Sequence, residues 1–243
     1  GTGTTYTLTA SEVGKVMTVV ASYTDGGNTV ESVTSSATGT IRGLDQEATG
    51  TVTNTGTSQE GGLVGVSTSN LADADGSVSV SGVRWQVSNT GTGSWSDIAG
   101  ATGTSWTIAD SQLYVNRYIR AVVTTVDGAG GTTELYGAAR QVTNVNDLPT
   151  GAVSISGTVA QGSTLTASNN VSDADGLGTI TYTWQANGAT VGTGTTYTLT
   201  QAEVGQVMTV VASYTDGFSQ AESVTSARTA AVHRPEFQAH VVL

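Results

Sequence analysis

The feature that most restricts the fold of this chain is its internal repetition. Residues 1–42 match residues 192–233 at 29 of 42 positions without a gap. A more diverged copy lies between them, in which LADADG at 71–76 parallels VSDADG at 171–176. The period is about 90 to 100 residues, which is the size of one small β-sandwich. A chain of tandem small domains is therefore expected.

The repeat boundaries divide the chain into four parts. We expect 1–42 to be the C-terminal half of one repeat, containing its last three strands. Two complete repeats follow at 43–143 and 144–232. The tail at 233–243 contains both His residues and one of the two Pro residues. This shift in composition indicates an expression scar or an unrelated terminus rather than a metal-binding tail.

Short runs of Thr and Val dominate each repeat and alternate with a period of two residues. Examples are TITYTWQ at 179–185 and QVMTVVASYT at 206–215, and turn residues interrupt such runs every eight to twelve residues. The helix-like pieces at 9–14 and 200–205 are single turns at most. The sequence predicts an all-β fold of sandwich domains joined end to end by short linkers.

The composition excludes several classes of function. The chain has 243 residues and a net charge of −11, with no Cys and two His, and 11% of its residues are charged. An acidic surface does not favour nucleic acid, which requires a basic stripe. No apolar run is long enough to span a membrane. Both His residues, His233 and His240, lie near the C-terminus, which argues against triad or zinc chemistry in the repeats, so we expect no enzyme.

The tryptophans divide into core and surface candidates. Trp85 and Trp184 lie at matching positions on the third strand of each complete repeat, where an inward Trp fills the space between two sheets. Trp106 replaces Tyr197 of the last repeat, so we expect it in the core as well. Trp95 belongs to an insertion in the middle repeat and is the candidate for stacking on a carbohydrate or protein ligand, together with the Thr-rich strand faces.

Carboxylates concentrate at the ends of the repeats. In a sandwich of this size, the loops after the first and fifth strands lie at one end, and the loops after the second and sixth strands lie at the other. At the junction between the two complete repeats, we therefore expect one cluster of acidic and amide side chains. Its members are Glu60, Asp110, Asn144, Asn146, Asp147, Asp173, Asp175 and Asp216.

Such a cluster of like charges is costly unless cations neutralise it. Ca²⁺ takes six to eight oxygen ligands and requires neither His nor Cys, so it is the cofactor that this composition favours. The first junction has a looser version of the same layout, with Glu12, Asp45, Asp73, Asp75 and Asp127. The alternative is that the DADG and TDG segments are only turns, because Asp-Gly suits tight turns.

Several long blocks resemble a known family. They are VNDLPTG at 145–151, DADGLGTITYTWQ at 173–185, TYTLTQAEVGQVMTVVASYTDG at 196–217 and AESVTSA at 221–227. These blocks are similar to the tandem immunoglobulin-like, cadherin-like repeats of very large bacterial surface adhesins of the RTX type. No glycine-rich nonapeptides of the RTX secretion end occur in the chain.

The resemblance implies an extracellular extender region on the bacterial cell surface. Its stacked domains, rigidified by Ca²⁺ at their junctions, would hold a distal adhesive domain away from the cell in attachment or biofilm formation. Carried over by position, Asn146 and Asp147 match linker ligands of the family, and Asp173 and Asp175 match its Asp-x-Asp pair. The first linker, at 42–47, departs from the family pattern and contains Arg42.

Two expectations concern partners. Neighbouring repeats of the same chain are the expected contacts, with no nucleic acid and no membrane span. The chain begins without Met or a signal peptide and halfway through a repeat. Half a sandwich leaves an apolar face and unpaired strand edges. We therefore expect residues 1–42 to be completed by preceding sequence or by a second copy of the chain through strand exchange.

Overall fold

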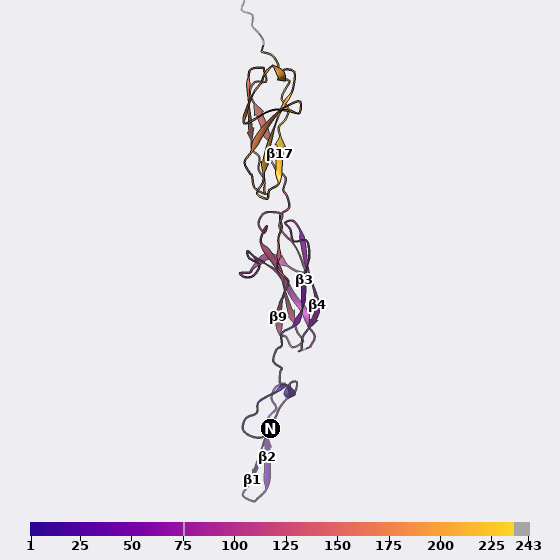
Figure 1. The fold of residues 1–243 in the computed structure, drawn as a ribbon. Helices are drawn as coiled ribbons and strands as arrows, with labels where there is room; N and C mark the ends of the chain where they lie inside the picture. Colours follow the sequence, from indigo (N-terminus) through magenta and orange to yellow (C-terminus); the bar gives the residue numbers. More distant parts are fainter. Residues whose placement is uncertain (75, 236–243) are drawn as a thin grey trace, which may run out of the picture.

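The computed structural model describes residues 1–74 and 76–235. These residues form three bodies that follow one another in a line, and each body is an elongated arrangement of strands (Figure 1). Among the described residues, the two helical elements are three-residue 3₁₀ turns, and every other regular element is a strand. The all-β fold class expected from the sequence is confirmed.

The first body is a hairpin preceded by one helical turn. The turn η1 (Ala10–Glu12) begins at Thr9, whose side chain and that of Glu12 form a reciprocal capping box. The strands β1 (Val20–Thr24) and β2 (Val30–Thr34) pair in an antiparallel manner. All residues of both strands are exposed, so this body has no buried core of its own.

The middle body is a sandwich of two antiparallel sheets. One sheet has the order β3 (Thr49–Gly56), β4 (Leu63–Ala72) and β7 (Ser105–Thr107). The other sheet has the order β10, β8, β5 and β6, and β9 also pairs with β8. The bounds in this sheet are β5 (Ser79–Ser88), β6 (Ser96–Thr102), β8 (Tyr118–Val126), β9 (Thr132–Tyr136) and β10 (Arg140–Gln141).

The last body repeats this plan. One sheet has the order β11, β12 and β15, and the other has the order β14, β13, β16 and β17. The turn η2 (Gln201–Glu203) connects β15 to β16. The strand bounds are β11 (Val153–Ser156), β12 (Thr164–Asn169), β13 (Thr181–Ala186), β14 (Ala189–Thr193), β15 (Thr196–Thr198), β16 (Met208–Thr215) and β17 (Ala221–Thr225).

The two sandwiches have equivalent cores. Trp85 on β5 and Trp184 on β13 are both 0% exposed, as their position on the third strand predicts. The indole N–H of Trp184 donates to the carbonyl oxygen of Gly194 at 2.9 Å, which satisfies its one polar atom. Its ring stacks on Tyr197, and the Trp85 ring packs against Trp106 at a tilt of 38°. Each core therefore fixes one sandwich independently of the other.

The ends of the strands position the junctions. The chain enters the last body beside the β12–β13 and β16–β17 loops, where the amide of Gly217 donates to the carbonyl of Asp175. It leaves the middle body beside the β3–β4 loop, where the amide of Glu60 donates to the carbonyl of Thr143. Loops from both sandwiches therefore surround the linker at 144–149. In the part of the chain described here, no helix is long and apolar enough to cross a membrane.

Candidate functional site

Three carboxylates meet where the middle sandwich joins the last one. Glu60 comes from the β3–β4 loop, Asp147 from the linker and Asp175 from the β12–β13 loop. One oxygen of each lies within 4.8 Å of the others, and this group could hold a metal ion. Glu60 is 2% exposed and Asp175 is 4% exposed. The group therefore unites two repeats and the linker in a single, largely buried acidic site.

The linker backbone is held from both sides by these acids. One oxygen of Glu60 accepts a hydrogen bond from the amide of Val145 at 2.7 Å. One oxygen of Asp175 accepts from the amide of Asp147, also at 2.7 Å. The two bonds fix the path of the linker and leave the carboxylate of Asp147 directed into the acidic group.

Gln112 closes the site with a neutral donor. Its side-chain nitrogen donates to Asp175 Oδ1 at 2.7 Å, to Asn144 Oδ1 at 2.8 Å and, more weakly, to Glu60 Oε2 at 3.4 Å. An amide nitrogen carries only two hydrogens. Three oxygen acceptors therefore compete for two protons, and the site remains rich in unneutralised oxygen.

The charges of the site act on one another. Burial raises the pKa of Glu60, and Asp147, Asp175 and Asp110 raise it further, against the hydrogen bond from Val145. Burial also raises the pKa of Asp147, with Asp175 and Asp110 adding to the shift. A raised carboxyl pKa means that the ionised form is disfavoured where it stands. The site therefore stores electrostatic repulsion that a bound cation or a proton would relieve.

The other acids and amides expected at this junction lie around the central three. Asp110 is exposed, but its charge acts on both Glu60 and Asp147. Asp173 accepts hydrogen bonds from the amide of Asp175 and from the hydroxyl of Tyr214. Asn144 is connected to the three carboxylates through Gln112, which donates a hydrogen bond to its side-chain oxygen.

Asn146, in contrast, uses its side-chain nitrogen to donate to Glu222 at 2.9 Å, on the flank of the last sandwich. The structure therefore gives this linker amide a partner outside the group of three carboxylates.

Asp216 divides its two oxygens between two tasks. Oδ1 accepts from the amides of Phe218 and Gln220, each at 2.8 Å, and so shapes the β16–β17 turn. Oδ2 is buried without a hydrogen-bond partner, and the residue is 7% exposed. Because a buried carboxylate oxygen without a partner is costly, this atom is a candidate cation ligand beside the Asp175 loop.

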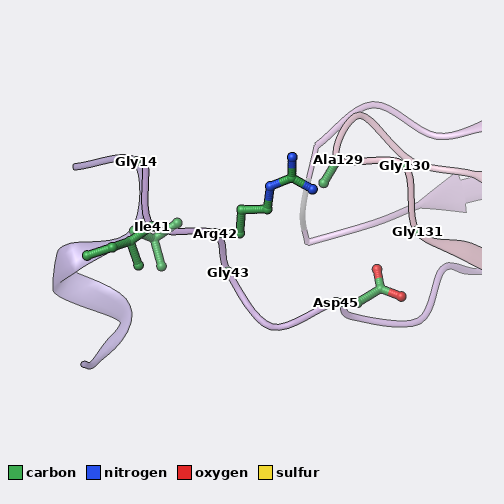
Figure 2. A pocket seen from close by; sticks show the side chains of 9 residues that line it. Gly14, Ile41, Arg42, Gly43, Asp45, Ala129, Gly130 and Gly131 are labelled. Carbon is green, nitrogen blue, oxygen red and sulfur yellow. The ribbon is translucent and has the colours of Figure 1, made fainter. Parts of the chain in front are cut away.

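At the first junction, the acids that the structure describes are less buried than Glu60 and Asp175. Asp127 in the β8–β9 loop repeats the pattern of Asp216, with Oδ1 accepting from the amides of Ala129 and Gly131 and with Oδ2 buried and unpartnered. Asp45 of the linker lies over the same Gly131. Figure 2 shows the Arg42 side chain extended toward this loop across a hollow of about 620 Å³. Arg42 and Asp45 therefore line the same hollow at this junction.

The remaining residues expected at the first junction behave differently. Both oxygens of Glu12 are engaged in its own turn, with Thr9 and Ser11, and these hydrogen bonds lower its pKa to about 2. Asp73 forms an isolated bridge with Gly76. Asp75 lies outside the described residues.

Trp95 has a partner within the molecule. The guanidinium of Arg120 lies 4.3 Å from the centre of the Trp95 ring and 4.4 Å from that of Tyr136. Stacking of this kind stabilises the ring where it lies. The residue is half-buried, so part of its surface remains open to a ligand.

Gln112 is the main residue that sequence reasoning missed. In the alignment of the two repeats, Ala109 corresponds to Thr200 of the last repeat. Gln112 corresponds to Glu203, and in each repeat the two residues of the pair are three positions apart. In the last repeat, the Glu203 carboxylate accepts from the Thr200 amide and hydroxyl in a capping box. Ala109 has no hydroxyl to complete such a box. This replacement is the signal in the sequence that frees the side chain of residue 112 for the junction.

Comparison with known proteins found similar solved structures but no family. No model of a protein family matches the sequence, and no curated protein matches it. One similar solved structure is a Ca²⁺-stabilized adhesin that helps an Antarctic bacterium reach out and bind ice. The identity is 17%, the match covers 90% of this chain and 56% of that one, and the TM-score is 0.39.

Two further solved structures are similar to the chain. A tetra-tandem repeat from the extending region of a large adhesion protein has 19% identity and a TM-score of 0.31, with 90% of this chain and 57% of that one covered. A structure from a 1.5-MDa bacterial ice-binding adhesin has 16% identity and a TM-score of 0.27, with coverages of 92% and 76%.

These neighbours are large bacterial adhesins and their extending regions, the class that the sequence resembles. This chain spans little more than half of the first two structures. Because the TM-scores are below 0.5, any functional argument has to rest on the junction itself.

Proposed function

We propose that this chain is a set of non-catalytic extender repeats of a large bacterial surface adhesin, stiffened by Ca²⁺ at the junctions between repeats. The observation that carries the proposal is the convergence of Glu60, Asp147 and Asp175 from two consecutive sandwiches and their linker on one buried point. Neither sandwich contains this group alone. A function that depends on the relation between repeats is therefore favoured.

The donor set fits calcium. The side chains that the structure brings together at the junction offer carboxylate and amide oxygens and the Gln112 nitrogen, and the metal-ligating group found among the described residues consists of carboxylates alone. Ca²⁺ prefers such oxygen ligands and tolerates irregular geometry, which suits a site assembled from two domains. When bound, the cation would supply the positive charge that the cluster lacks. Glu60, Asp147 and Asp175 would hold it, with Asp216 and Asn144 as further candidates.

The shape of the chain supports a role in extension. The bodies follow one another in a line, and the chain enters each sandwich at one end and leaves it at the other (Figure 1). Each added repeat therefore adds length rather than bulk. A flexible joint would shorten the end-to-end distance, because successive repeats could fold back on one another. An extender therefore requires a fixed junction.

In the proposed extracellular location, the repeats would need a source of stability other than disulfides. Without Cys the repeats cannot be stabilised by disulfides. Bound calcium stabilises a folded state by mass action when the ion is abundant outside the cell. In this proposal the junction ions take the place of covalent cross-links, and the distal adhesive domain lies elsewhere in the parent adhesin.

Small-angle scattering and calorimetry with calcium or chelator would test the proposal. We expect calcium to raise the melting temperature and to narrow the distribution of shapes around an extended form. Glu60→Gln combined with Asp175→Asn should abolish both effects, whereas Asp97→Asn, which removes an exposed carboxylate paired with Arg84, should leave both intact. A maximum dimension and a melting temperature that do not respond to calcium in the unaltered chain would contradict the proposal.

A further inference from the structure

The outer face of the larger sheet in the middle sandwich has a group of stacked side chains. The rings of Trp95 and Tyr136 both lie against the guanidinium of Arg120, whose central carbon is 4.3 Å and 4.4 Å from the two ring centres. Arg120 also donates two hydrogen bonds to Gln86 Oε1, at 2.9 and 2.8 Å. These bonds and the two rings fix the position of the guanidinium. We call Trp95, Arg120 and Tyr136 the stacked patch.

Arg120 is the cation of this face that has no carboxylate partner. Asp97 and Glu134 both form ion pairs with Arg84, at 3.0 and 2.8 Å. Among the described residues, no acid lies within ion-pairing distance of Arg120. Burial and the charge of Arg84 lower the pKa of Arg120, against the opposing effects of Tyr136 and Glu134. In a chain with a net charge of −11, this face therefore presents a partly buried positive charge without an acid of its own.

The last repeat forms the same kind of sheet without these side chains. In the strand registers of the two sheets, Thr209 corresponds to Arg120. Thr225 corresponds to Tyr136. The segment that contains Trp95 is an insertion, because the middle repeat is eight residues longer between its buried third-strand Trp and its fifth-strand Trp than the last repeat between the equivalent aromatic residues. In the last repeat, Thr209 and Thr225 line a polar hollow of about 410 Å³. The sandwich therefore folds without the stacked patch.

The stacked patch lies at the side of the molecule rather than at a junction. The strands of the middle body run along the line of the three bodies, so its sheet faces point sideways (Figure 1). Tyr136 is 49% exposed, and Trp95 is half-buried. Arg120 lies on β8, which pairs with β5 on one side and with β9 and β10 on the other. A ligand at this place therefore has to be recognised by side chains, because the main chain of β8 is already paired on both sides.

A sugar that bears a carboxylate matches both parts of the stacked patch. One face of a sugar ring exposes C–H groups, which pack on aromatic rings. A carboxylate forms charge-assisted hydrogen bonds with a guanidinium. We propose that the stacked patch binds an acidic sugar residue of a glycan, with the sugar ring against the open surface of Trp95 and Tyr136 and the carboxylate on Arg120. This binding role is additional to the extension proposed above, and it does not require calcium.

Other anionic ligands fit the stacked patch less well. An acidic peptide gains much of its affinity by pairing with a strand edge, which is not available beside Arg120. Nucleic acid requires several cations along its backbone, whereas the other Arg of this face, Arg84, is already paired with two acids. A second copy of the chain also has a net charge of −11, so the two copies repel each other. The acidic sugar is therefore the favoured ligand.

Titration of the full chain with matched acidic and neutral sugars would test the proposal. The probes are an oligomer of galacturonic acid with its methyl ester, and sialyllactose with lactose. Chelator in every titration removes calcium that could link a carboxylate to the acidic junction. We expect each acidic probe that binds to do so at least about tenfold more tightly than its neutral counterpart. In the NMR spectrum, the indole N–H signal of Trp95 should shift, and that of the buried Trp184 should not.

Variants of the chain locate the binding. Trp95→Ala and Arg120→Thr should each weaken the binding of the acidic probe by at least about tenfold. Arg120→Thr introduces the residue type that the last repeat has at this position, so we expect the variant to fold, and its melting temperature checks this. Arg228→Thr removes a cation from the hollow on the equivalent face of the last repeat and should leave binding unchanged.

Binding of either acidic probe with these properties supports the proposal, and the probe that binds more tightly identifies the source of the sugar. Absence of binding to both acidic probes would overturn it, as would equal affinity for an acidic probe and its neutral counterpart. Equally tight binding of an oligomer of glutamic acid would also overturn it, because the patch would then recognise charge alone. None of these results changes the expected response of the junction to calcium, so the extender proposal is tested separately.

Discussion

Asp147→Asn should have opposite effects on stability with and without calcium. Asp147 is the linker member of the acidic group, and its backbone amide, rather than its carboxylate, makes the hydrogen bond to Asp175. The substitution keeps the size of the side chain and removes one charge. Because the pKa of Asp147 is raised by burial, Asp175 and Asp110, the ionised form destabilises the cation-free junction. The asparagine chain should therefore be more stable than the natural one in chelator.

The magnitude follows from the spacing. Two unit charges 4.8 Å apart repel by about 0.9 kcal/mol even at the dielectric constant of water. Removing Asp147 eliminates its repulsion with Glu60 and with Asp175, so we expect a gain of about 1 to 2 kcal/mol in the free energy of unfolding in chelator. In calcium at about 100 times the dissociation constant, the natural chain gains about 2.7 kcal/mol, and most of this gain should be lost in the variant.

Differential scanning calorimetry measures both signs. A change of 1 kcal/mol shifts the melting temperature of a domain of this size by about 4 to 8 °C. We expect the variant to melt several degrees higher than the natural chain in chelator and lower in calcium. The control Asp97→Asn, which removes the same charge from the sheet surface, should not reverse sign between the two conditions. A variant that is less stable in chelator and still responds fully to calcium would refute the electrostatic account.

Four further outcomes are expected. Val210→Ala removes two buried carbons and should lower the free energy of unfolding by about 2 kcal/mol in calorimetry. Val19→Ala, in the same local sequence but exposed, should leave the free energy of unfolding unchanged. Equal effects would contradict the assigned burial. Desolvation raises the pKa of Glu203, but its hydrogen bonds outweigh desolvation and the net pKa is lowered. Glu203→Gln should therefore cost about 1 kcal/mol of stability at neutral pH and progressively less as the pH falls below about 4.3. A cost that does not depend on pH would argue against this linkage. Gln112→Glu adds a carboxylate and removes a donor, so the melting temperature in chelator should fall, and the rise in melting temperature on adding calcium should become larger. An unchanged rise would argue against a role for Gln112 at the junction. Trp95→Ala should lower stability by loss of its stack on a guanidinium, and loss of binding on a glycan array would support the ligand-binding alternative.

The fold could be predicted because its causes are local and periodic. Alternation along TITYTWQ places Trp184 inward, and the same alternation in MTVVASYT yields the inward series on β16 from Met208 to Tyr214. The acids of the second junction could be placed because each lies in a loop whose end of the sandwich follows from strand order. For this reason, the sequence alone predicts that Glu60, Asp147 and Asp175 lie at one junction, where the structure places them together.

The details of the site depended on packing that no period encodes. Asn146 donates its side-chain hydrogen bond to Glu222 on β17 rather than to the group of three carboxylates. Gln112 reaches three oxygens because Ala109 cannot cap the turn before it. Each outcome is decided by which partner is nearest in the folded chain. A neutral amide also gives no signal in a search for charges.

The turn interpretation and the cation interpretation of the TDG and VDG aspartates are compatible. Asp25, Asp127 and Asp216 each use one oxygen to bind two loop amides. In Asp127 and Asp216 the second oxygen is buried and has no partner, although a turn alone would not require its burial. At the end of a sandwich where another repeat adjoins, the same residue can therefore shape its loop and present an oxygen to the junction. Glu60 comes from one end of the middle sandwich and Asp175 from the facing end of the last one, so the acidic group is complete only where these two repeats meet. The stiffness proposed for the chain is therefore a property of adjacent repeats and not of any single domain.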